Sequence, residues 1–149
     1  SSEAFANATL GHAQALSNCE ELINRFYLFG VRALNATMPT NYYAYMRVLQ
    51  LIEQVCDDLI LNSKTSKKVP VEMINKVKTQ FEMSMEALSG DEGAISRAID
   101  FGEPMLEKLD VKKPATYGEM LFRDMVQSTI AIAETGIAFR KPSNGDSLL

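Results

Sequence analysis

Histidine and cysteine are scarce in this sequence. His12 is the only histidine among 149 residues, and Cys19 and Cys56 are the only cysteines. A catalytic triad, a histidine proton shuttle or a histidine-rich metal site would all depend on that one imidazole. His12 falls in an apolar helical pattern, which favours a structural role. Two cysteines without CxxC spacing are too few for a disulfide scaffold.

Motifs with a known chemical mechanism are absent as well. The sequence contains no GxGxxG, GxxxxGK[ST], GxSxG or HExxH. Three pairs of carboxylates are spaced by four residues: Glu53 and Asp57, Glu82 and Glu86, Glu103 and Glu107. A carboxylate-bridged metal centre in a bundle would also need Glu-x-x-His on partner helices, and no such motif exists. The sequence therefore predicts a non-enzymatic protein with no metal and no cofactor, in which these carboxylates are solvated.

Basic charge in excess and long apolar runs are also lacking. The net charge is −4 and the pI is near 5.0, so no basic surplus exists to neutralise nucleic-acid phosphates. No apolar run approaches the roughly 20 residues that span a bilayer. The N-terminus shows no cationic start followed by an apolar block, as a signal peptide would. We therefore expect an intracellular, soluble protein, with a secreted form left open.

What the sequence does contain is a helical pattern. Hydrophobic residues make up 46% and charged residues 23%, which suits one domain over 1–149 with a flexible tail at 141–149. Strand-like alternation is absent, whereas apolar residues recur at steps of three and four. The pattern predicts an all-α fold, a compact bundle of about five main helices. The expected ranges are 2–36 with a possible break at 11–17, 41–61, 70–88, 92–110 with a kink at 102–104, and 117–139.

Capping boxes mark three of the expected helix starts. In this motif a Ser or Thr caps the first turn and a Glu three residues later reaches back to it. The motif occurs at Ser17–Glu20, Ser89–Glu92 and Thr116–Glu119. For the helix over 70–88, the spacing predicts a buried face made of Ile74, Val77, Phe81, Met85 and Leu88.

The stretch 32–45, RALNATMPTNYYAY, joins the first two long helical patterns. Asn35 begins an Asn-Ala-Thr triplet, as does Asn7, and this triplet is the N-glycosylation acceptor of secreted proteins. Helix ends favour Asn, Thr and Pro for backbone reasons alone, so we interpret the stretch as the corner of an antiparallel helical hairpin. Cys19 and Cys56 are equidistant from this corner. We expect them to be buried neighbours, as reduced thiols rather than as a disulfide.

The helix over 41–61 is apolar around most of its girth. Such a helix is either central in the bundle or covered by a partner. The candidate interaction surface consists of Val48, Leu51, Val55, Met73 and Met83. We hypothesise a non-catalytic protein that acts through protein–protein association or self-assembly, as a structural subunit, adaptor or chaperone, and we expect a protein partner or a homo-oligomer. The alternative is a sensory or binding domain that encloses a small apolar ligand or pigment. Its aromatic walls would be Tyr42, Tyr43, Tyr45 and Tyr117.

Overall fold

The computed structural model describes residues 2–65, 68–109 and 116–140, with side chains from Ser17 onward. The fold is all-α, as predicted, and the described residues contain no strand. The helices are α1 (Ser2–Thr37), α2 (Tyr42–Lys64), α3 (Val71–Ala87), α4 (Glu92–Glu107) and α5 (Tyr117–Thr135), followed by the short 3-10 helix η1 (Gly136–Phe139). The side chains of Asn7 and His12 and the predicted tail at 141–149 lie outside the described residues.

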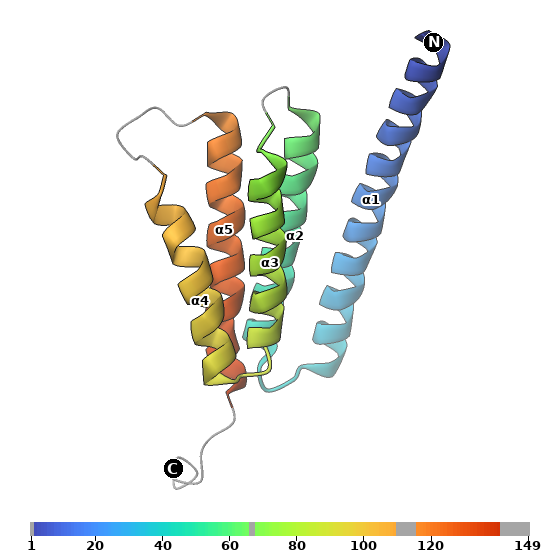
Figure 1. Cartoon of the computed structure of the whole chain (residues 1–149). Helices are drawn as coiled ribbons and strands as arrows, with labels where there is room; N and C mark the ends of the chain where they lie inside the picture. The colour runs from blue at the N-terminus through green and yellow to red at the C-terminus, as the bar shows by residue number, and fades with distance from the viewer. Residues whose placement is uncertain (1, 66–67, 110–115, 141–149) are drawn as a thin grey trace, which may run out of the picture.

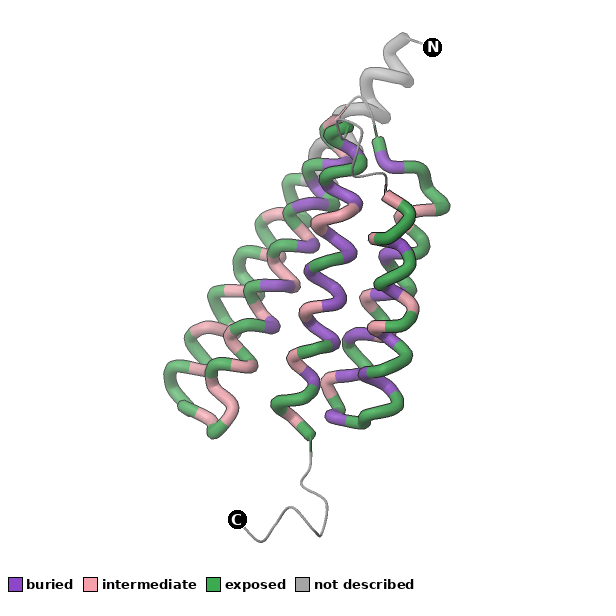
Figure 2. Tube along the Cα trace, turned by 90° about the vertical axis from the view of Figure 1, so that its left-hand side faces the viewer, coloured by how far each residue is buried: buried purple, intermediate pink, exposed green. Residues whose placement is uncertain are grey.

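Consecutive helices run in opposite directions, and α5 occupies the centre (Figure 1). It packs closely against α2, α3 and α4, and α3 also packs against α4. The helix at the edge is α1, whose close packing within the described structure is with α2. No described side chain of α1 is buried, whereas buried residues line the inner helices (Figure 2). The structure is therefore a four-helix core with a long fifth helix along one side.

The core consists of two apolar clusters around α5. The larger cluster contains Val69, Val77, Met105, Leu121, Phe122, Met125, Val126 and Ile130. The smaller cluster contains Ala87, Ile95, Ala98 and Ala133. Small side chains in the second cluster let α3, α4 and α5 approach one another near the α3–α4 turn.

The inward face of α3 differs from the prediction. Its buried residues are Val77, Gln80, Ser84 and Ala87. Ile74 and Phe81 are only half-buried, and Met85 is exposed. A buried glutamine is tolerable because the Gln80 side-chain amide donates a hydrogen bond to the Ala98 carbonyl oxygen over 2.8 Å. The apolar stripe of α3 is thus turned partly away from the core, although Ile74 packs against the larger cluster.

The first helix is continuous, so the possible break at 11–17 does not occur. Ser17 lies in its interior and starts no helix. A glycine inside a helix costs only about 1 kcal/mol relative to alanine, and good helix formers flank Gly11 on both sides. In α4 the helix likewise runs through Gly102 and Pro104 and ends at Glu107.

The capping box at Thr116 is confirmed. The Glu119 backbone N–H donates to Thr116 Oγ1 over 3.1 Å, and the Glu119 carboxylate accepts from the Thr116 backbone N–H. The box predicted at Ser89 is wrong, since the N-cap of α4 is Asp91, which accepts from the Ala94 N–H over 2.9 Å. Gly90 explains the shift. Its φ of +83° extends the turn, which moves the start of α4 two residues on.

We expect Thr116→Ala and Asp91→Ala each to lower the free energy of unfolding by about 1 kcal/mol, because each change removes a side-chain N-cap. Ser89→Ala should change it by less than about 0.5 kcal/mol, as an exposed residue outside the helix. Urea denaturation followed by circular dichroism measures all three. A loss for Ser89→Ala as large as that for Asp91→Ala would contradict this assignment.

Candidate functional site

The structure places the predicted interaction residues inside the fold. Val48, Leu51 and Val55 are buried on α2, on the side that belongs to the core. Met73 is half-buried against the larger apolar cluster, and Met83 is half-buried against the smaller one. They do not form one continuous open surface, although Val55 also lines a groove between α2 and α3. The broad apolar girth of α2 reflects its position between α1 and α5.

The cysteine prediction is partly wrong. Both thiols are free, but Cys19 is exposed on α1 and Cys56 is half-buried on α2. Burial raises the pKa of the Cys56 thiol, and the negative charges of Asp57 and Glu53 add to that rise. The corner itself is as predicted: Asn35 lies near the end of α1, and its side-chain oxygen accepts a hydrogen bond from the Tyr42 hydroxyl over 2.6 Å.

The four tyrosines proposed as pocket walls do not form one enclosure, although the rings of Tyr42 and Tyr43 are in edge contact. Tyr42, Tyr43 and Tyr45 lie at the start of α2, where the Tyr45 ring is 4.8 Å from that of Phe139. Tyr117 lies at the start of α5, at the opposite end of the bundle (Figure 1). The expected aromatic enclosure is therefore not assembled.

Apolar side chains are instead left open along α1. Leu22, Phe26 and Phe29 follow one another at steps of four and three residues, with exposed fractions of 68%, 62% and 72%. Phe26 borders the seam between α1 and α2, where it lies near Ile52. The stripe therefore runs along the edge of the α1–α2 contact.

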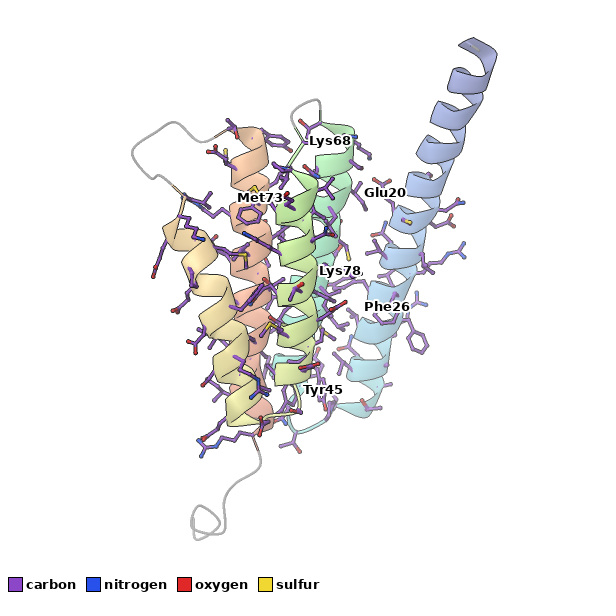
Figure 3. The ribbon with its side chains drawn as sticks, in the orientation of Figure 1. Glu20, Phe26, Tyr45, Lys68, Met73 and Lys78 are labelled. Atoms are coloured by element: carbon purple, nitrogen blue, oxygen red, sulfur yellow. The ribbon has the colours of Figure 1, made fainter. Side chains whose placement is uncertain are left out.

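A second open apolar face lies between α2 and α3. These two helices are not a closely packed pair in the described fold, and a groove of about 280 Å³ separates them. The residues lining it are Val55, Cys56, Leu59, Ile74, Val77, Lys78 and Phe81. All except Lys78 are apolar or a thiol, and Leu59 is 38% exposed. Lys78 of α3 and Phe26 of α1 are shown in Figure 3 on the two sides of the opening between these helices.

The two faces form one trough, with α2 as its floor and α1 and α3 as its walls. We define the trough by Leu22, Phe26 and Phe29 of α1, Ile52, Cys56 and Leu59 of α2, and Ile74, Lys78 and Phe81 of α3. The sequence did contain these residues as periodic stripes. It gave no means of deciding which stripes face inward.

A pair of carboxylates between α2 and α5 is the second notable cluster, and the sequence reading missed it. Asp58 is buried, with 3% exposure, and its partner Asp124 is half-buried on α5. The Gln54 side-chain amide donates to Asp58 Oδ1 over 3.3 Å and to Asp124 Oδ2 over 3.0 Å. Asp58 Oδ2 is buried and accepts no hydrogen bond. A proton on this carboxyl group can be shared with Asp124.

The environment of Asp58 favours that proton. Burial, followed by the hydrogen bond and the negative charge of Asp124, raises the pKa of its carboxyl group from 3.8 to about 8, while the hydrogen bond from Gln54 opposes the rise. The described residues offer no group of three or more His, Cys, Asp or Glu side chains that could hold a metal ion. Because of its raised pKa, the charge of Asp58 at this contact between α2 and α5 changes with pH.

Comparison with known proteins gives no relative. No protein-family model, no curated protein and no solved structure matches this chain. Within the described residues, no helix is both long enough and apolar enough to cross a membrane. The open apolar surface of the fold is therefore the feature that bears on function.

Proposed function

We propose that the protein acts by binding another protein chain in the trough, as a non-catalytic adaptor or structural subunit. The observation that supports this is the open apolar face shared by α1, α2 and α3. Apolar patches of this kind on a folded chain mark interaction sites, because their exposure to water is unfavourable. On α3, Val71 and Met85 are exposed and Phe81 is half-buried, while Gln80 and Ser84 are fully buried. A partner that covered these open apolar side chains would stabilise the complex.

The edge position of α1 supports the same proposal. Its close packing in the described fold is with α2 alone, and Leu22, Phe26 and Phe29 stay exposed on it. A partner that covered about 800 Å² of this surface would make an interface of ordinary size.

A small apolar ligand fits the trough less well than a protein does. Ligand pockets typically have volumes of about 300 to 1,000 Å³ and enclose most of the ligand. The groove between α2 and α3 has about 280 Å³ and continues openly toward α1. Its shape suits an elongated partner that keeps one of its own sides exposed to solvent.

A photo-crosslinking amino acid placed in the trough tests the proposal. With benzoyl-phenylalanine at Leu59, irradiation in an extract of the source cells should give a discrete adduct with a protein chain. The matched control carries the same group at Ile137, which is 61% exposed and lies outside the trough.

Adducts that form at Ile137 but not at Leu59, or equally at both positions, would overturn the proposal. A second substitution separates specific binding from non-specific hydrophobic adsorption. Phe26→Ser should abolish the adduct from Leu59, because it removes an exposed trough wall without changing the core.

A further inference from the structure

We infer that the occupant of the trough is an amphipathic α-helix of a partner protein, which presents a carboxylate to Lys78. This inference rests on the proposed function and specifies the partner. It follows from the spacing of the trough residues, from the vacant position in the bundle and from the charge within the trough.

The spacing of the trough residues suits a helix. On α1 the open residues are Leu22, Phe26 and Phe29, and on α2 they are Ile52, Cys56 and Leu59. On α3 the stripe runs through Val71, Ile74, Lys78, Phe81 and Met85. All three stripes have steps of three and four residues, the pattern by which helices pack side by side. An extended peptide would instead need an open strand edge, and the described chain has no strand.

The position of the trough also suits a helix. In the described bundle α5 packs closely against three helices, whereas α2 and α3 do not pack closely against each other and the close packing of α1 is with α2 alone. A helix laid on α2 between α1 and α3 would contact all three stripes. The α3 stripe from Val71 to Met85 spans about 21 Å at 1.5 Å per residue, so the occupant needs about 15 residues, or four turns.

The charge in the trough selects the partner. Lys78 is exposed between Ile74 and Phe81, and it is the one charged side chain that lines the groove between α2 and α3, whereas Glu53 lines the hollow between α1 and α2. It makes no ion pair with any described residue. A bound helix would cover the lysine stem and lower the local dielectric, so a carboxylate facing Lys78 favours binding and a cation there opposes it.

The exposed α1 helix of a second copy of this chain is a poor source of that carboxylate. Its apolar stripe runs from Leu22 to Phe29, and this segment contains Arg25 but no Asp or Glu. If two copies met symmetrically through their α3 stripes, the two Lys78 side chains would face one another as like charges. The charge in the groove therefore favours a helix of another protein, and a second copy is one outcome of the test below.

Two designed helical peptides of 15 residues test the inference. Both have leucine at the positions that face the trough, and they differ only in a central Glu or Lys. Fluorescence anisotropy should show that the Glu peptide binds about three- to fivefold more tightly, the size expected for one partly exposed ion pair. Lys78→Glu should reverse the preference, and Lys78→Met should remove it while binding persists.

Alkylation of Cys56 locates the bound peptide. In a Cys19→Ser background, saturating Glu peptide should slow the reaction of Cys56, which lies on the floor of the trough. Equal affinities of the two peptides for the wild-type protein would overturn the inference, as would binding that leaves Cys56 unprotected. A wild-type dimer that protects Cys56 without peptide would show that the occupant is a second copy. If crosslinking from Leu59 gives an adduct but the Glu and Lys peptides bind equally well, the proposed function stands and this inference is refuted.

Discussion

Leu51→Asp should unfold the protein at neutral pH. Leu51 has 6% exposure and lies with Val48 and Val55 on the side of α2 that belongs to the core. The new carboxylate would be buried without a cationic partner, which costs several kcal/mol, about as much as the whole stability of many domains. Far-UV circular dichroism and a thermal melt measure the outcome.

Leu59→Asp is the matched control, with the same substitution two turns along the same helix. Leu59 is 38% exposed in the trough, so its carboxylate can remain hydrated and the fold should persist. A folded Leu51→Asp variant with a wild-type melting curve would mean that α2 is placed wrongly against α5. If both variants unfold, the trough is a covered part of the core.

Asp58→Asn should stabilise the protein at neutral and mildly alkaline pH and flatten the dependence of stability on pH. The pKa of Asp58 is raised to about 8 in the folded state, against about 3.9 in an unfolded chain. The folded state therefore binds more protons between these values, so wild-type stability is greatest at low pH and falls as the pH rises from about 4 to about 8. Asparagine has no proton to lose and keeps the shape of the acid.

The size of the effect follows from the same linkage. Each unit of difference in pKa corresponds to about 1.36 kcal/mol, so a gain of more than about 1 kcal/mol at pH 8 is expected. The charged or polar groups around Asp58 are Gln54 and Asp57 on α2 and Arg123, Asp124 and Gln127 on α5. Urea denaturation at pH 5 and pH 8 gives the slope. Asp57→Asn changes the exposed neighbour and should retain the wild-type dependence of stability on pH. If the free energies of unfolding of wild type and Asp58→Asn change with pH in parallel, the shared proton is contradicted.

The existence of the helices could be predicted because it depends on local pattern. The steps of three and four residues, the corner at Pro39 and the capping box at Thr116 act over a few residues each, and all three reappear in the structure. The shift of the α4 cap from Ser89 to Asp91 depended on Gly90, whose positive φ lets the turn pass close to Phe139. That contact joins distant parts of the chain, and no local pattern contains it.

The orientation of the helices could not be predicted, because apolar periodicity is the same for a core face and for an open face. On α2, the stripe with Ile52, Cys56 and Leu59 resembles any buried stripe, yet Leu51 and Val55 are the residues in the core. On α3, buried Gln80 and Ser84 would count as surface residues in any hydropathy pattern. The trough follows from these assignments, so its position became visible only when the helices were packed.

The ion pair between Lys64 and Glu20 has a consequence for the shape of the trough. Near the corner α1 is tied to α2 by the Asn35–Tyr42 hydrogen bond and by Gly30, whose missing side chain lets Leu49 approach closely. Farther along, the described tie is the exposed pair of Lys64 Nζ and Glu20 Oε1 at 2.6 Å. Exposed pairs contribute at most about 1 kcal/mol and weaken as salt screens them. A higher salt concentration therefore weakens the contact that holds the far end of α1 to α2. We expect the entrance of the trough to be wider in a saltier solution.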